Sequence, residues 1–169
     1  SSSLHHCEQR KTDKLYYMDT FLNEAFSMAA EHLICGSDST ASRIRRFNGS
    51  DYKPGSSLTT WNGTLDNYAN SYLFGQYLRT RYRQSGLANK ADGSDFYQTV
   101  YDWCVDPTDL NGKPIYDENG KQVRYDGNAM DVVADLLQTN AISLTIDFWT
   151  AVCLNQSAGV FGFAGEDWA

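Results

Sequence analysis

The chain has 169 residues, of which 41% are hydrophobic, 14% are aromatic and 21% are charged, and its formal net charge at pH 7 is -7. This length and apolar content allow one sizeable core, so we expect a single domain over 1–169 or a large piece of one. The acidic balance argues against a nucleic-acid partner, which needs clustered Lys and Arg. No apolar run approaches the roughly 18 residues of a membrane span, and the first residues lack a signal-peptide pattern, although a mature secreted form would lack it too.

The segment Asp19–Cys35 predicts a core helix of about four turns, because it lacks Gly and Pro and its apolar residues recur at helical spacing. Two carboxylates, Glu24 and Glu31, lie seven residues apart on one stripe at the border of the apolar face. A carboxylate at such a border needs a cation or hydrogen-bond donors nearby. The spacing alone leaves two interpretations open: both acids pair with Lys or Arg at the solvent margin, or they belong to a site.

A loop is expected between this helix and the next one. Gly36 and the small polar residues behind it are typical of a helix end, and 42–61 is predicted to be irregular, with at most a short strand or helical turn near 44–48. A loop of this length inside a compact domain often lines a site.

A second long helix is predicted over Thr64–Gln84. Gly75 in its middle costs about 1 kcal/mol relative to Ala, which indicates either that another backbone approaches there or that a group on the neighbouring turn needs the space. We therefore expect the helices at 19–35 and 64–84 to pack against each other. The tyrosines along one face, including Tyr72, are as consistent with packing in the core as with a place in a functional site.

Three shorter helices complete the predicted fold, over 94–104, 128–137 and 143–154, the last being apolar over most of its surface and expected inside. Asn119-Gly120 between two β-prone runs predicts a surface hairpin inserted at 111–125. A short extended apolar piece is expected at 160–163. The fold class is mainly α, a bundle of about five helices with one inserted β-hairpin.

The four cysteines lie far apart, without a C-x-x-C, so a zinc ribbon or a thioredoxin-like motif is excluded. An even number permits two disulfides in three connectivities. Cys35 and Cys153 end apolar helical runs and are also consistent with buried thiols.

Residues 21–31, F-L-N-E-A-F-S-M-A-A-E, resemble the second zinc-binding helix of the gluzincin metallopeptidases, most closely the hyicolysin-like branch. In that family the helix carries the carboxylate that completes a site begun by H-E-x-x-H on an earlier helix. The resemblance implies that Glu24 is the third protein ligand of zinc and that Glu31 is a neighbour that fixes the helix or a histidine ligand.

Two later stretches extend the resemblance. Tyr72-Leu73-Phe74-Gly75 is similar to a Y-x-x-G segment in gluzincin aminopeptidases, which implies that the Tyr72 hydroxyl stabilises the oxyanion. Residues 147–155 and 159–163 resemble the end of the hyicolysin-like catalytic domain. The resemblance covers roughly 9–163 apart from the hairpin, so it implies the C-terminal subdomain of a metallopeptidase-like catalytic domain.

The sequence contains no H-E-x-x-H. In one register Leu4 directly follows the missing motif. In another His5 stands at its second histidine, which would make His5 a zinc ligand and would put Ser1 and Ser2 where the first histidine and the general base belong.

The sequence leaves three functional interpretations open. The first is the C-terminal portion of a zinc-dependent peptidase, acting on a peptide or protein substrate but inactive as this fragment. The second is a non-catalytic pseudo-peptidase, and the third is a secreted helical domain that binds peptides, glycans or protein through its tyrosine-rich faces. The family resemblance favours a secreted or cell-surface location, and the sequence leaves the oligomeric state open.

Overall fold

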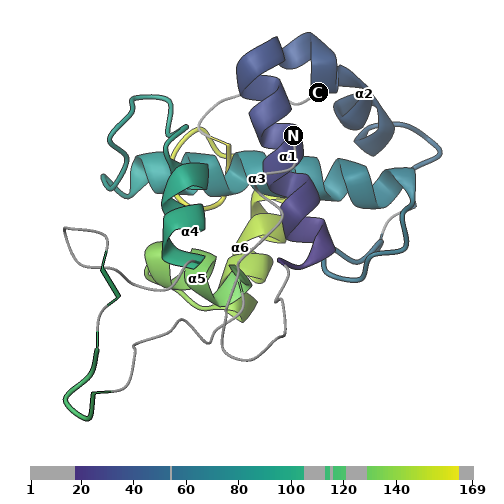
Figure 1. The fold of residues 1–169 in the computed structure, drawn as a ribbon. Helices are drawn as coiled ribbons and strands as arrows, with labels where there is room; N and C mark the ends of the chain where they lie inside the picture. The colour runs from purple at the N-terminus through teal and green to yellow at the C-terminus, as the bar shows by residue number, and fades with distance from the viewer. Residues whose placement is uncertain (1–17, 54, 105–112, 115, 121–128, 164–169) are drawn as a thin grey trace.

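The structure is a computed structural model that describes residues 18–53, 55–104, 113–114, 116–120 and 129–163. Within these ranges the fold is mainly α, as predicted, and only the isolated bridge residues Pro114 and Tyr116 have strand character. The described helices are α1 (Thr20–Cys35), α2 (Ser37–Phe47), α3 (Leu65–Gln84), α4 (Phe96–Cys104), α5 (Ala129–Leu136) and α6 (Ala141–Leu154) (Figure 1).

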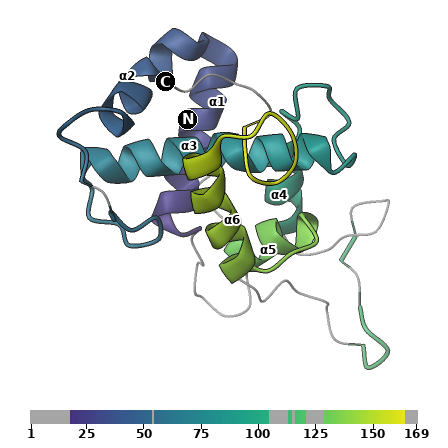
Figure 2. The ribbon, with the colours of Figure 1, turned by 180° about the vertical axis from the view of Figure 1, so that it is seen from behind.

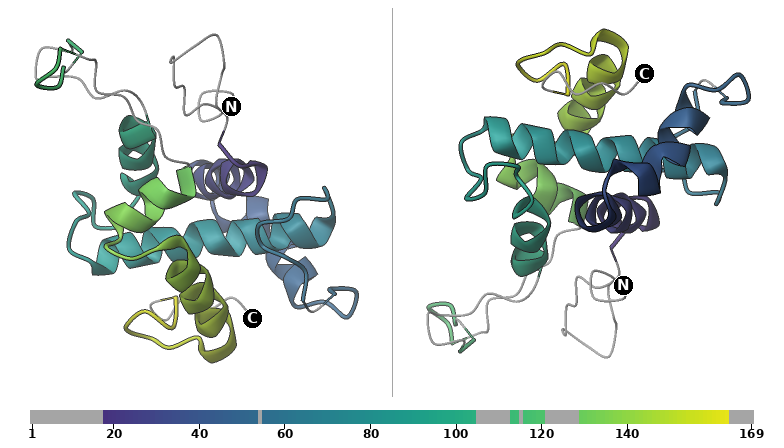
Figure 3. Two further views of the ribbon diagram at one scale, coloured as in Figure 1. Left: turned by 90° about the horizontal axis from the view of Figure 1, so that it is seen from below. Right: turned by 90° about the horizontal axis from the view of Figure 1, so that it is seen from above.

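Helix α3 is the centre of the fold. It runs across the molecule with α1 on one side and α6 on the other, as the view from behind and the view from below both show (Figures 2 and 3). Every residue from Ala69 to Thr80 is buried, which explains why the helix has no clear polar face. Its start is fixed by Thr64, whose side chain accepts a hydrogen bond from the Asn67 amide while the Asn67 side chain accepts one from the Thr64 amide.

The predicted packing of α1 on α3 is confirmed, and Gly75 is where the two backbones meet. A Cβ atom added to Gly75 would lie 2.7 Å from the carbonyl oxygen of Ala25. Next to this crossing the ring of Phe21 in α1 packs on Phe74 in α3, with centroids 6.2 Å apart. The glycine therefore permits an interhelical distance that no other residue would allow.

The core extends to both sides of α3. On the α1 side, Phe26 meets Phe96 and Tyr97 edge to face, at centroid distances of 5.7 Å and 5.2 Å. On the α6 side, Phe148 packs on Phe74 at 5.1 Å. Tyr82 of α3 packs on Phe96 at 5.3 Å, so α3 contributes rings to the aromatic clusters on both of its sides.

The sequence-based prediction for 36–47 is wrong, because this stretch forms α2 and not a helix end followed by a loop. Gly36, with a φ of 84°, separates α1 from α2 and lets the chain turn between them. Thr40, Ile44 and Phe47 lie on one face of α2 at spacings of four and three; Thr40 is buried, and the other two pack on the core.

An ion pair joins α2 to α3. The Arg46 Nε atom donates to the Asp66 carboxylate at 2.6 Å, and the Lys53 amide donates to the other carboxylate oxygen at 3.2 Å. Burial would raise the pKa of Asp66, but the hydrogen bonds from Arg46 and Lys53, with the Arg46 charge, lower that pKa below its ordinary value. Asp66 is therefore ionised at neutral pH.

Helix α6 lies on the surface, contrary to the expectation that it would be inside. Only Leu144, Phe148 and Ala151 are buried, whereas Ile142 and Ile146 are 75% and 59% exposed. The helix packs one face on α5 and, through Phe148 on Phe74, on α3, and in the described part of the chain its opposite apolar face stays exposed. No helix in the described ranges is both long and apolar enough to cross a membrane.

Two of the cysteines also differ from the prediction of buried thiols. Cys35 and Cys153 are free and exposed, because each stands at the last turn of its helix on the side away from the core.

The turn of the predicted hairpin is described, but the hairpin is not. The Gly120 amide donates to the Asp117 carbonyl at 3.0 Å, and Gly120 has a φ of 75°. The second arm, 122–125, lies outside the described residues, so the hairpin stays a prediction. The predicted extended piece at 160–163 instead belongs to a compact loop, in which the Gln156 amide donates to the Phe161 carbonyl at 3.0 Å.

Candidate functional site

Glu24 occupies the second turn of α1, at the border of its buried face, where the spacing places it. Its side chain is half-buried, and no donor or cation within the described residues reaches its carboxylate. The carboxylates of Asp66 and Asp147 are paired with arginines, and that of Asp95 accepts two backbone amides. Glu24 therefore differs from these acids in holding oxygen atoms available to a ligand.

Glu31 lies two turns further along α1 and is exposed. It has no partner in the described part of the chain. His5, the other residue implied as a ligand, lies outside the described residues. Glu31 and Glu24 share one stripe of α1, as the spacing predicts.

The donors needed for a zinc site are incomplete in this part of the chain. Within the described ranges, no three His, Cys, Asp or Glu side chains lie close enough together to hold a metal ion. Catalytic zinc takes three protein ligands and keeps one position for water or substrate. The described residues thus do not fit a complete zinc site, and Glu24 could supply only one ligand of it.

Tyr72 takes part in a buried contact between three helices. Its hydroxyl lies 2.9 Å from His32 Nδ1 on α1 and accepts a hydrogen bond from Thr40 Oγ1 on α2 at 3.1 Å. His32 Nδ1 and Thr40 Oγ1 are 3.2 Å apart, and the Tyr72 side chain is fully buried. The three groups close a small polar network that holds α1, α2 and α3 together.

Glu24 is not part of this network. It precedes His32 by eight residues, which is about 12 Å along a helix axis. The structure therefore brings Tyr72 to His32 and Thr40, two residues that the sequence analysis did not select. The available signal was weak: a single histidine near the end of an apolar helix, facing a segment predicted to be a loop.

We expect Tyr72→Phe to lower the free energy of unfolding by about 1–3 kcal/mol, because Thr40 loses a buried acceptor and His32 loses a partner. Urea unfolding of the 169-residue chain measures this. Tyr116→Phe is the matched control, since Tyr116 is 60% exposed and should change stability by less than about 0.5 kcal/mol. Equal stability of the two variants would contradict a structural role for the Tyr72 hydroxyl.

Comparison with known proteins gives one informative match. The neutral metalloprotease ShpI of Staphylococcus hyicus is 46% identical to this chain over an alignment of 65 residues, and the match covers 36% of this chain and 15% of that protein. Part of this chain is thus related to a metalloprotease. No known protein-family profile matches the sequence. The match spans a small fraction of the relative, so the activity of that whole protein does not transfer to this chain by identity alone.

Proposed function

We propose that this chain carries the C-terminal subdomain of a zinc-dependent peptidase, in which α1 presents Glu24 as a protein ligand of the metal. The observation that carries the proposal is the half-buried Glu24 carboxylate, which lacks a partner in the described residues. The 46% identity to a neutral metalloprotease over 65 residues supports it independently. Zinc held by Glu24 and by ligands from outside the described residues would supply a Lewis acid for the scissile carbonyl and would lower the pKa of a bound water.

The packing of α1 supports the role of Glu24. The contact between Ala25 and Gly75 is next to Glu24 and fixes the helix against α3, so the Glu24 carboxylate is presented from a rigid element. Glu31 is proposed to fix a histidine ligand by accepting its ring N–H. The substrate is a peptide or protein, and the protein acts outside the cell or at its surface.

Two roles are open for the Tyr72 hydroxyl, one in catalysis and one in stability. The family resemblance favours a donor to the oxyanion, whereas the hydroxyl in this structure contacts His32 and Thr40. In an active protein, Tyr72→Phe should lower kcat and leave zinc bound if the first role operates. A loss of stability with unchanged kcat per folded molecule assigns the second role alone.

The remaining zinc ligands and the general base are proposed to come from outside the described residues: in one register both histidines belong to an H-E-x-x-H segment that precedes Leu4, and in the other His5 is one of the ligands. The 169-residue chain alone is therefore expected not to hydrolyse casein in the presence of zinc. The same chain, extended ahead of Ser1 by a segment that bears H-E-x-x-H, should cleave casein and should lose this activity with a zinc chelator. Chelator-sensitive cleavage by the unextended chain would contradict the proposal.

A non-catalytic binding domain is the second candidate, and the exposed apolar face of α6 favours it. The tyrosine-rich face of α3 does not favour a binding domain, because Tyr72, Tyr77 and Tyr82 are buried. Zinc binding that requires Glu24 separates the two candidates, since a binding domain of this kind needs no metal.

A further inference from the structure

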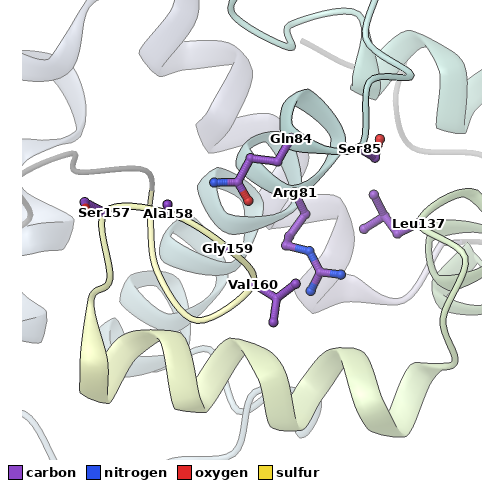
Figure 4. Close-up of a pocket in the computed structure, with 8 residues that line it drawn as sticks. All are labelled: Arg81, Gln84, Ser85, Leu137, Ser157, Ala158, Gly159 and Val160. Atoms are coloured by element: carbon purple, nitrogen blue, oxygen red, sulfur yellow. The ribbon is translucent and has the colours of Figure 1, made fainter.

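A pocket of about 430 Å³ lies between the C-terminal part of α3 and the loop after α6 (Figure 4). Arg81, Gln84 and Ser85 line it from α3, Leu137 from the end of α5, and 157–160 from the loop. The loop after α6 that lines the pocket lies on one side of α3, and α1, which carries Glu24, lies on the other side of α3 (Figures 2 and 3). The pocket is thus a separate site, and a ligand bound there would be independent of the proposed peptidase function.

The loop wall of the pocket is held in place by the protein. The Tyr77 hydroxyl donates to the Val160 carbonyl at 2.8 Å, and the loop closes through the bond from Gln156 to Phe161. A side chain at Gly162 would collide with the backbone of Gln156, so the closed loop requires glycine there. Burial raises the pKa of Tyr77 despite the nearby Arg81, which keeps the hydroxyl protonated and able to donate. The pocket is therefore formed before any ligand arrives.

Arg81 is the charged group of the pocket, and some of its N–H donors have no acceptor among the described residues. Its side chain is only 12% exposed. The Nη1 atom donates to the Tyr77 hydroxyl at 2.9 Å and to the Asp147 carboxylate at 3.3 Å. A guanidinium carries five N–H donors, and in the described part of the chain Nε and Nη2 have no acceptor. Nε and Nη2 together form an edge that fits both oxygens of one carboxylate.

The rest of the lining suits a ligand with a small apolar body. Leu137 and Val160 lie on either side of the Arg81 guanidinium (Figure 4), and Ala158 continues the apolar wall. The exposed Gln84 side chain has no partner among the described residues and extends toward the loop, where it can bind a second polar group of the ligand. An apolar wall with a few polar groups suits a small organic ligand, and the arginine adds a partner for a carboxylate on that ligand.

We propose that this pocket binds a small organic carboxylate, with the carboxylate on the Nε–Nη2 edge of Arg81 and the apolar body between Leu137 and Val160. The carboxylate belongs either to a free small acid or to the C-terminus of a peptide. Both sources present the same group to Arg81, and the experiment separates them.

The test is a titration of the isotope-labelled 169-residue chain, monitored by NMR. N-acetylvaline should shift the NMR signals of the backbone amides of Ser157 and Gly159. N-acetylvalinamide, which has the same body without the charge, should bind at least about tenfold more weakly. Arg81→Gln should weaken the binding of the acid by a similar factor. Arg45→Gln removes the same charge from an exposed position on α2 and should leave binding unchanged.

A second variant keeps the test decisive if Arg81→Gln fails to fold. Ala158 is exposed at the pocket, so Ala158→Leu should fold and should reduce binding by occupying the space. A tripeptide ending in valine that binds more tightly than N-acetylvaline assigns a peptide terminus, and one that binds more weakly assigns a free acid. Equal binding of acid and amide, or wild-type affinity in both variants, would overturn the proposal.

Discussion

Replacing Gly75 with valine is expected to destabilise the chain by about 3 kcal/mol or more, because a Cβ at this position would meet the Ala25 carbonyl oxygen at 2.7 Å. That oxygen is backbone within α1, so it cannot move unless α1 and α3 separate. Separation would open the aromatic contacts on this side of α3, including Phe21 with Phe74. Gly75→Ala gains about 1 kcal/mol of helix propensity but still introduces the same Cβ, so it should destabilise by less than valine does.

Urea unfolding of the glycine, alanine and valine forms measures this series. The control is Ser42→Ala and Ser42→Val on α2, at an exposed helical position where a larger side chain meets no neighbour from another helix. Both controls should stay within about 0.5 kcal/mol of the unchanged chain. A more stable Gly75→Ala variant would show that propensity alone decides the effect, and the close approach of α1 and α3 would then be wrong.

The helices that could be predicted from sequence are those with strong local signals. Helix α1 has an unbroken apolar pattern, and α3 has a long run without helix breakers apart from Gly75, a glycine that is typical of close packing in mid-helix. Helix α2 was missed because Gly36 and the polar residues after it are also typical of a helix end. Its helical character depends on Thr40, Ile44 and Phe47 reaching α1 and α3, and that contact is tertiary.

The position of α6 could not be predicted for a related reason. Its composition is apolar on nearly every side, and composition does not tell which side a neighbour covers. The start of α6 is fixed by Asn140, whose side chain accepts a hydrogen bond from the Ser143 amide at 2.9 Å. The helix therefore begins at Ala141, two residues earlier than the sequence indicated. The exposure of Ile142 and Ile146 is a property of how α6 sits on α3 and α5.

The position of Glu24 on its helix could be predicted from the sequence, whereas its role as a metal ligand stays a prediction. The border position of Glu24 is a consequence of the helical period, and the structure adds that this carboxylate lacks a partner among the described residues. The contacts of Tyr72 could not be predicted, because one of them needs α2, which the sequence did not reveal. Both partners are also distant in sequence: Thr40 precedes Tyr72 by 32 positions and His32 precedes it by 40. The role that the Y-x-x-G segment implies for Tyr72 therefore has to be weighed against its contacts with His32 and Thr40.

Glu24→Ala is the second substitution for which we expect a large effect. In a form of the chain extended by an H-E-x-x-H segment, the proposed site would have two histidines and Glu24 as protein ligands, so this substitution would remove one of three. Loss of a supporting residue around a metal site costs about 10–100-fold in affinity, so loss of a direct ligand should cost about 100-fold or more. Asp38→Ala, an exposed acid on α2, is the control and should not change zinc affinity.

The measurement that tests the central claim most directly is zinc binding by that extended form with and without Glu24, by competition with a coloured chelator and by metal analysis of the purified protein. The proposed function predicts about one zinc per chain in the unchanged protein and in Asp38→Ala, as expected for a single catalytic site. It predicts a loss of tight zinc binding in Glu24→Ala while the far-UV circular dichroism stays helical. Undiminished zinc affinity in Glu24→Ala would contradict the assignment of Glu24 as a metal ligand.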